Sequence, residues 1–267
     1  MSATGDGTWT TELSTAWNIG ESANGGYAMS AVLRALSEVS GFPDPISVTT
    51  HFLRTVQGGG TGSIDTELIR RGRSVAVARG RLRQADAVRL LVTAAMGDLD
   101  DGLDHDADDD GLDDDADDDS ISASPPDLER PEACVARSGS AQGVELPIAS
   151  RVEVRIPPAR MVPGHSDEAV TEGWIRFADS SPPSALALPL FADAFPPSLF
   201  SKFGQVGWVP TIELTVHVRR RPADGWIQAR FECDDLIGGR MIESGTLWDS
   251  AGRVVARSRQ LGLHLTG

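Results

Sequence analysis

The fold of this chain is indicated most clearly by one stretch of its sequence, Val209-Pro210-Thr211-Ile212-Glu213-Leu214-Thr215-Val216-His217-Val218-Arg219-Arg220-Arg221. Apolar and polar residues alternate from Ile212 to Arg219. Because successive side chains of a strand point to opposite faces, this alternation predicts a strand with one buried and one polar face. A similar stretch, Val48-Thr49-Thr50-His51-Phe52-Leu53-Arg54, lies about half a chain earlier.

Length and composition favour a folded protein without covalent staples. The 267 residues, 40% of them hydrophobic, suffice for one large domain or two modest ones. Cys134 and Cys233 lie far apart, which argues against a disulfide framework or a cysteine metal site and favours a reducing compartment. Residues 1–6 lack the features of a signal peptide, and no apolar run approaches the ~20 residues that span a bilayer. We therefore expect a soluble cytoplasmic protein.

The net charge of −15 is concentrated in one segment. Fourteen aspartates lie between Asp98 and Asp119, and without them the chain has 25 acidic and 24 basic residues. Such a run predicts a solvated loop. The alternative is a calcium loop, because Asp106, Asp108, Asp110 and Asp117 imitate its spacing, although flanking helical patterns are missing. The nearly neutral remainder excludes a basic nucleic-acid footprint.

Each half of the chain shows a helix followed by an antiparallel meander. In the first half, Asn24-Gly25-Gly26-Tyr27 precedes apolar residues at helical spacing, and strands are predicted over 46–56, 62–71, 74–84 and 88–96. The Gly-Gly turn either receives an anion or carbonyl oxygen on free N–H groups, or simply lets a buried helix enter tightly. In the second half, strands over 150–156 and 172–178 precede a helix over 185–194, and strands over 210–221, 225–234, 239–249 and 253–265 follow it.

A constant offset relates the two halves. His51 and His217 are 166 positions apart, and the same shift brings Gly72 onto Gly238 and Val88 onto Val254. The repeated order of elements with a common offset indicates an internal duplication. The equivalent positions of the two histidines favour a structural role on the sheet over catalysis.

Five phrases, in order along the chain, carry a resemblance to a known family. They are Asn24-Gly25-Gly26-Tyr27, His51-Phe52-Leu53-Arg54, Arg71-Gly72-Arg73-Ser74, Pro210-Thr211-Ile212-Glu213 and Ser258-Arg259-Gln260-Leu261-Gly262. Together they resemble the bacterial acyl-CoA thioesterase II family and its actinobacterial relatives. The resemblance implies an α+β double hotdog, in which each of two fused units wraps an antiparallel sheet around a long helix. We expect an N-terminal unit over 1–97, an Asp-rich loop and linker over 98–149, and a C-terminal unit over 150–267.

The resemblance also implies the reaction, which is hydrolysis of an acyl-CoA thioester to a free acid and CoA without metal or cofactor. The family's water-orienting acid, hydroxyl and amide match Asp193, Thr211 and Gln260. Taken alone, Asp193 could be a surface acid and the other two could make ordinary sheet hydrogen bonds. The offset of 166 places Tyr27, Pro45 and Ala94 opposite them, so the first half is expected to lack such a set.

Residues that bind the substrate are less clearly indicated. The backbone of Gly25 and Gly26 is our candidate for stabilising the oxyanion. Arginines would contact the CoA phosphates, either Arg219, Arg220 and Arg221 or Arg70, Arg71 and Arg73, unless these are solvent-facing charges at strand ends. Phe191, Phe195 and Phe203 are candidates for lining the acyl groove. The competing hypothesis is a non-catalytic hotdog module that binds acyl-CoA or a protein partner. Under both hypotheses we expect this chain to form a homo-oligomer of double hotdogs.

Overall fold

The computed structural model describes residues 1–5, 7–100, 121–139, 143–204 and 209–265. The elements of the first half are β1 (Ser2–Gly5), β2 (Thr8–Leu13), β3 (Asn18–Ile19), β4 (Ser22–Ala23), α1 (Gly25–Ser40), β5 (Asp44–Phe52), β6 (Gly60–Arg71), β7 (Val75–Gln84) and β8 (Ala87–Gly97). Those of the second half are β9 (Val135–Ala136), β10 (Val152–Ile156), β11 (Val170–Phe177), α3 (Leu188–Ala192), α4 (Leu199–Phe203), β12 (Thr211–Val218), β13 (Ile227–Ile237), β14 (Arg240–Trp248) and β15 (Val254–Leu263).

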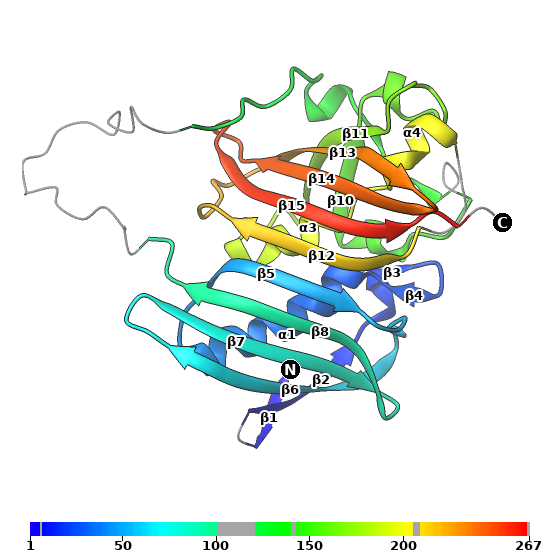
Figure 1. Cartoon of the computed structure of the whole chain (residues 1–267). Coiled ribbons are helices and arrows are strands. Elements are labelled where there is room, and N and C mark those ends of the chain that lie inside the picture. The colour runs from blue at the N-terminus through cyan, green and yellow to red at the C-terminus, as the bar shows by residue number, and fades with distance from the viewer. Residues whose placement is uncertain (6, 101–120, 140–142, 205–208, 266–267) are drawn as a thin grey trace, which may run out of the picture.

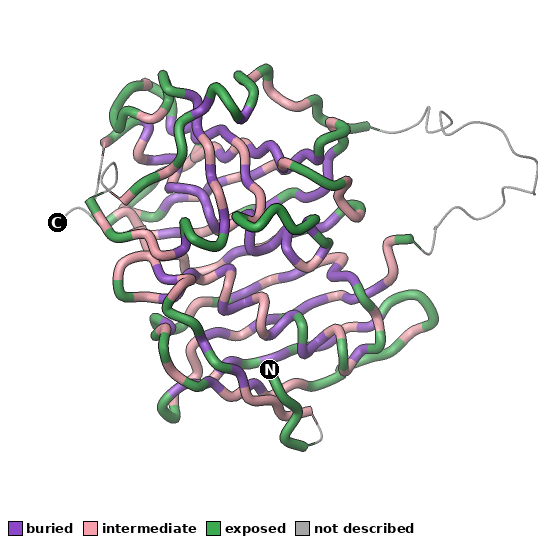
Figure 2. Tube along the Cα trace, turned by 180° about the vertical axis from the view of Figure 1, so that it is seen from behind, coloured by how far each residue is buried: buried purple, intermediate pink, exposed green. Residues whose placement is uncertain are grey.

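One continuous antiparallel sheet connects the two halves (Figure 1). Its order is β1-β2-β6-β7-β8-β5-β12-β15-β14-β13-β11-β10-β9, so the two halves meet where β5 pairs with β12. The helices lie on one face of this sheet. Buried residues follow the layer between helices and sheet, whereas the loops and sheet edges are exposed (Figure 2). The predicted antiparallel meanders of both halves are confirmed.

The pairing of β5 with β12 brings equivalent positions of the duplication together. Thr49 pairs with Thr215, which is 166 positions later, and their hydroxyl oxygens are 3.0 Å apart. Both strands also carry a register shift at their start, between Pro45 and Ser47 and between Thr211 and Glu213. A local two-fold axis therefore passes between the two threonines, and the beginning of each strand lies beside the end of the other.

The core of the first half is built on α1. Asn24 caps its N-terminus by accepting a hydrogen bond from the Tyr27 N–H at 2.9 Å, and Gly41 ends it with a φ of 70°, which glycine adopts without strain. One side of the helix is fully buried against β5 to β8 through Ala28, Met29, Val32, Leu33 and Leu36. Gly80 in β7 allows this approach, because an added Cβ would lie 2.5 Å from Val32.

The second half differs from the expected long helix. Where α1 would have its counterpart, the structure has a 3-10 turn over Ala185–Ala187, then α3 and α4, each of five residues. Pro196 and Pro197 lie between α3 and α4 and cannot donate helical hydrogen bonds, so one uninterrupted helix cannot form there. The expectation of a long helix in each unit is therefore wrong for the second unit.

The described part of the linker packs on the C-terminal unit. Trp248, Gln228 and Trp174, from three neighbouring strands, donate side-chain hydrogen bonds to the carbonyl oxygens of residues 123, 126 and 129. β9 then adds to the edge of the sheet beside β10. The proposed calcium positions 106–117 lie outside the described residues. Among the described helices, none has the length and apolar character needed to cross a membrane.

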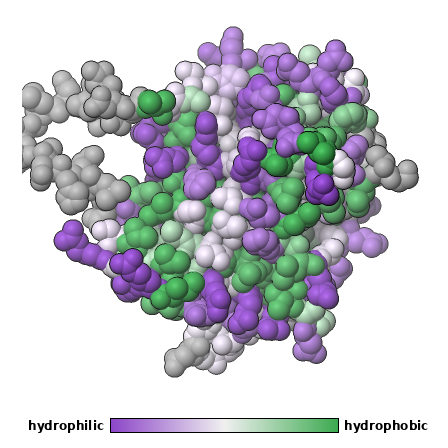
Figure 3. Space-filling view, viewed as in Figure 1, coloured by the Kyte–Doolittle hydropathy of each residue, from purple (hydrophilic) through white to green (hydrophobic). Residues whose placement is uncertain are grey.

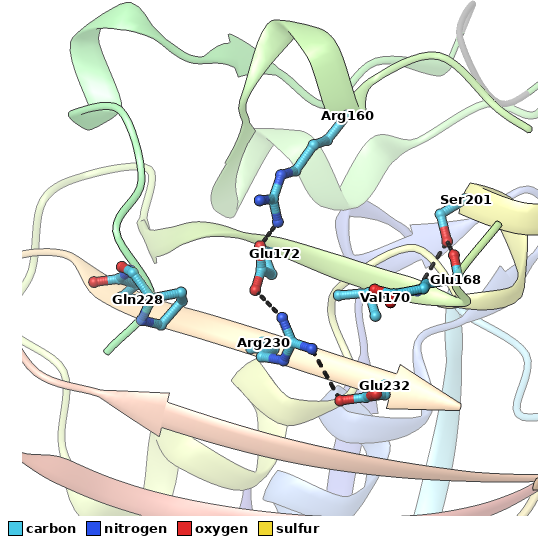
Figure 4. A network of polar contacts seen from close by, with 9 residues as sticks. Arg160, Glu168, Val170, Glu172, Ser201, Gln228, Arg230 and Glu232 are labelled. Atoms are coloured by element: carbon cyan, nitrogen blue, oxygen red, sulfur yellow. Dashed lines mark hydrogen bonds and ion pairs between the residues drawn. The ribbon is translucent and has the colours of Figure 1, made fainter. Parts of the chain in front are cut away.

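Polar and apolar side chains intermingle on the outer face of the sheet (Figure 3). An ion-pair network joins β11, β13 and the turn at Pro158–Arg160, and in it the buried Glu172 lies between Arg160 and Arg230 (Figure 4). Beside it, the Ser201 hydroxyl donates to the Glu168 carbonyl and accepts from the Val170 N–H. These contacts hold α4 against the start of β11.

Replacing Leu214 tests the alternation that first indicated the fold. Leu214 is fully buried on the helix-facing side of β12, whereas its neighbour Thr215 faces outward. We expect Leu214→Ala to lower the free energy of unfolding by about 2–5 kcal/mol, because it leaves a cavity. Thr215→Ala removes only hydrogen bonds and should cost about 0.5–1.5 kcal/mol. Urea unfolding measures both, and equal losses would contradict the assignment of faces.

Candidate active site

Asp193 of the second unit is held by the beginning of α1 in the first unit. Its Oδ2 accepts hydrogen bonds from the Gly26 N–H at 2.7 Å and from Asn24 Nδ2 at 2.9 Å. Asn24 Nδ2 also donates to the Asp193 carbonyl oxygen at 3.0 Å. Because Asp193 is the C-cap of α3, it would be poorly placed against the dipole of its own helix, but it faces the favourable N-terminus of α1.

The two glycines allow α1 to approach α3 closely. A Cβ at Gly26 would lie 2.9 Å from Leu190 Cα, closer than real side chains approach, and 3.0 Å from Asp193 Cβ, which is also tight. A Cβ at Gly25 would lie 2.6 Å from the Phe52 ring. The Gly-Gly turn therefore has both of the roles considered for it. It lets the buried helix enter tightly, and it presents an N–H group to an anionic carboxylate.

Thr211 and Gln260 lie together on neighbouring strands. Thr211 begins β12, and Gln260 is near the end of β15, where its Nε2 donates to Thr211 Oγ1 at 2.9 Å. Both side chains and Asp193 line one cavity of about 720 Å³. The structure thus brings the predicted acid, hydroxyl and amide to the same cavity.

Burial changes the acidity of Asp193. Removal from water raises its pKa from 3.8 to about 6. The hydrogen bonds from Gly26 and Asn24 and the charge of Arg137 act in the opposite direction, whereas the charge of Glu243 raises the pKa further. A carboxyl with a pKa of about 6 is mostly ionised at neutral pH and can still accept a proton effectively, as a general base must.

Three cavity residues have site contacts that the sequence did not predict. The sequence placed Asn24 at the entry to the first helix but did not predict its contact with Asp193. Arg137 is half-buried, desolvation lowers its pKa to about 10, and its Nη1 donates to the Ala194 carbonyl oxygen at 2.5 Å. Glu243 is buried on β14, where its Oε2 accepts from the Ser198 N–H at 2.9 Å. The sequence could have indicated Glu243, because it is a charged residue at an inward position of an alternating strand. No pattern in the sequence distinguishes Arg137, which lies in the linker.

Only some of the predicted substrate-binding residues line this cavity. Arg219 and Arg220 follow the end of β12 and are absent from the cavity lining, roughly 25 Å along the strand from Thr211. Arg54, which follows β5, is exposed and lines the cavity instead. Gly25 and Phe195 line it, whereas Phe191 and Phe203 do not. His51 and His217 are exposed on the outer face of the sheet.

The corresponding end of the first unit has different chemistry. Pro45 and Ala94 take the places of Thr211 and Gln260, as the offset of 166 predicts and as the matching strand registers show. Arg221 fills this end of the strand pair with ion pairs to Asp44, at 2.8 Å, and Asp98, at 2.9 Å. Among the described residues, the hydroxyl and amide therefore come together at one end of the pseudosymmetric strand pair only.

Comparison with family models agrees with this geometry. Residues 13–97 match the acyl-CoA thioesterase N-terminal domain, and residues 128–264 match the acyl-CoA thioesterase C-terminal domain. The chain belongs to the acyl-CoA thioesterase family. It is a thioesterase of the acyl-CoA thioesterase II type, and the match to the C-terminal domain includes most of the described linker as well as Asp193, Thr211 and Gln260.

Similar proteins extend over almost the whole chain. An uncharacterized protein of Mycobacterium tuberculosis H37Rv is 26% identical over 265 residues, which cover 94% of this chain and 89% of that protein. The crystal structure of a thioesterase II candidate from Thermobifida fusca is 27% identical, with a TM-score of 0.81 and coverage of 98% and 94%. A hot dog fold protein from Alicyclobacillus acidocaldarius, at 18% identity, has a TM-score of 0.82 over 100% and 96% of the two chains, and this likeness shows the fold.

Asn24 offers a test of how Asp193 is held. Asn24→Asp keeps an acceptor for the N-cap but replaces the amide donor by a second carboxyl, so the pKa of Asp193 should rise and the acidic limb of kcat/KM should move to higher pH. Asn24→Ser also retains a capping side chain but adds no charge. A pH profile of both variants measures the difference. Identical profiles would contradict the contact between Asn24 and Asp193.

Proposed function

We propose that the protein hydrolyses acyl-CoA thioesters to a free acid and CoA with a water molecule oriented by Asp193, Thr211 and Gln260. The observation that carries this proposal is the presence of all three side chains on one cavity, with the carboxyl group fixed by the other unit. The family membership supports the overall reaction. The assignment of the three residues rests on the resemblance that first indicated them and is supported by their place in one cavity.

The three side chains complement the hydrogen-bonding groups of water. Thr211 Oγ1 accepts from Gln260, so its own O–H is free to donate to the water oxygen. The Gln260 carbonyl oxygen can accept one water proton and the Asp193 carboxylate the other. This arrangement leaves a lone pair on the water oxygen for attack on the thioester carbonyl carbon.

Proton transfer to Asp193 accompanies formation of the new carbon–oxygen bond. The carbon–sulfur bond then breaks as the carbonyl re-forms, and the proton passes from Asp193 to the departing thiolate sulfur. Atoms and charge balance, and the carboxylate is regenerated. General-base assistance of this kind contributes roughly 100- to 10,000-fold to the rate.

The Gly25 N–H is our candidate donor to the oxyanion. Gly26 already donates to Asp193 and Tyr27 to Asn24, whereas the Gly25 N–H meets no acceptor within the residues that the structure describes. Gly25 lines the cavity at the start of a 16-residue helix, where partial positive charge favours an anion. Of the two glycines considered as oxyanion donors, only Gly25 therefore remains, because the Gly26 N–H donates to the proposed base, Asp193.

The cavity walls suit an acyl thioester. Apolar contributions come from both units, including Phe52, Val56, Phe195 and Phe231. Leu53, Arg54 and Thr55 are exposed where β5 ends, which places a cation at the rim. We infer that the acyl chain contacts the apolar walls and that Arg54 contacts a phosphate of CoA.

Asp193→Asn tests the base directly. An amide cannot accept the water proton, so we expect kcat to fall roughly 100-fold or more, with little change in the circular dichroism spectrum. For the unchanged protein, kcat/KM should rise with pH through about 6, where Asp193 ionises. Release of CoA from acyl-CoAs of several lengths, followed with a thiol reagent, measures both. Asp65→Asn, on an outward position paired with Arg83, is the matched control.

Stability provides an independent reading of the same variant. The pKa of Asp193 is higher in the folded protein than in the unfolded chain. Its contribution to the free energy of unfolding is therefore fully present below pH 3.8 and is lost as the pH rises through about 6. Asp193→Asn does not titrate and should be more stable than the unchanged protein at pH 8, by up to about 3 kcal/mol, since one pKa unit corresponds to about 1.4 kcal/mol.

Equal activity in the variant would refute Asp193 as the base, and tight acyl-CoA binding without turnover in the unchanged protein would instead indicate a binding module.

Arg54 and Arg220 form a matched pair because they occupy equivalent positions of the duplication. We expect Arg54→Ala to raise KM for acyl-CoA roughly 2- to 5-fold at low salt, with kcat unchanged, because an exposed charge contact is lost. Arg220→Ala should leave KM unchanged, since Arg220 lies at the opposite end. Steady-state kinetics at two salt concentrations make the comparison. The reverse pattern would place the CoA phosphates at the other end of the strand pair.

A further inference from the structure

A second buried carboxyl group, Glu243, lines the catalytic cavity. It lies on the inward side of β14, where the other inward residues, Met241, Gly245 and Leu247, are uncharged. Across the sheet, Glu243 pairs directly with Gln260 on one side and with Cys233 on the other. An ionisable group in this position is costly to bury, so it calls for a specific role.

The duplication provides independent support for such a role. Ala94 takes the place of Gln260 in the first unit, and Ala94 pairs with Ala78. Ala78 therefore occupies the place of Glu243. The two units thus differ at this position in the same way as at Thr211 and Gln260, since the second unit has a functional group where the first has an inert side chain. Glu243 belongs to the set of residues that distinguishes the unit with the catalytic groups.

Glu243 also holds the chain that follows Asp193. Its Oε2 accepts hydrogen bonds from both the N–H and the hydroxyl of Ser198, five residues after Asp193. Ser198 precedes α4, whose Ser201 is bonded to β11 (Figure 4). Residues on both sides of Ser198, including Pro196 and Phe200, form part of the cavity wall. The carboxyl group of Glu243 therefore fixes the wall beside the base.

The charges that face Glu243 come from several elements. Asp193 at the end of α3, Arg137 after β9 and Arg54 at the rim line the same cavity as Glu243, and the neutral thiol of Cys233 lies beside it on β13. Burial raises the pKa of Glu243, and its charge in turn raises the pKa of Asp193.

We propose that Glu243 is a positioning residue of the thioesterase, which holds the cavity wall beside Asp193 through Ser198. The proposal rests on the proposed function, in which Asp193 is the base. It assigns to Glu243 no contact with the reacting atoms. Its effect is exerted through the place and the ionisation of Asp193.

Glu243→Gln separates the electrostatic effect from the structural one. The amide oxygen can still accept from Ser198, so the fold and most of kcat should remain, but the neighbouring negative charge is lost. We expect the acidic limb of kcat/KM to move to lower pH by roughly half a unit. Glu243→Ala also loses the anchor and should lower kcat about 10-fold or more at every pH. Glu232→Gln, a half-exposed glutamate on the outer face of β13, is the control and should keep the original profile.

Ser198→Ala tests the link between the carboxyl group and the wall. Loss of the hydroxyl donor favours the protonated form of Glu243, so the acidic limb should again move to lower pH. In the double variant with Glu243→Gln, Ser198→Ala should cause no further movement of the limb. An additional, independent movement would overturn the proposed link.

Titration of the Asp193 carboxyl carbon by NMR, without substrate, completes the experiment. A lower midpoint in Glu243→Gln supports the proposal, and an unchanged midpoint overturns it even if the proposed function holds. Conversely, if the midpoint falls in Glu243→Gln but the unchanged protein does not hydrolyse acyl-CoA, the proposed function is refuted and the effect of Glu243 on Asp193 is established. If Glu243→Gln fails to fold by circular dichroism, the midpoint in Ser198→Ala decides, and it must fall for the proposal to stand.

Discussion

The contact between the Asp193 carboxylate and the N-terminus of α1 links the fold to the chemistry. It joins the two units across the cavity, and both of its donors, the Gly26 N–H and the Asn24 amide, belong to the first unit. A carboxyl group at the end of a short, buried helix would otherwise be both unpaired and unfavourably placed. Neither unit alone therefore contains the complete arrangement.

The same contact helps to set the acidity of Asp193, the proposed base. Burial opposes the ionised form of Asp193, while two hydrogen bonds and the charge of Arg137 favour it. Because burial outweighs the opposing hydrogen bonds and charge only in part, the pKa rises from 3.8 to about 6 and does not reach neutrality. A base in this range is ionised at neutral pH and retains enough proton affinity to assist attack by water. Close packing at Gly26 sets the geometry on which this compensation depends.

Local patterns predicted the repeated sheet well, because side-chain alternation and turn residues are short-range properties. The offset of 166 also placed Pro45 opposite Thr211 and Ala94 opposite Gln260, and the strand registers confirm both correspondences. The offset could not be carried into the helices, since α3 and α4 replace a single long helix. The interaction of Asn24 with Asp193 joins positions 169 residues apart, and no local pattern contains it. The structure places Arg219 and Arg220 away from the cavity of Asp193, because charge alone does not indicate at which end of a pseudosymmetric strand pair a cavity opens.

The central claim is that Asp193 activates water and does not itself attack the thioester. A single turnover in ¹⁸O-labelled water, followed by mass spectrometry of the released acid and of the peptide containing Asp193, tests this claim most directly. The account predicts one ¹⁸O atom in the carboxylic acid product and none in the peptide. Label in the Asp193 carboxyl group, with an unlabelled product acid, would show a covalent anhydride intermediate and contradict the account.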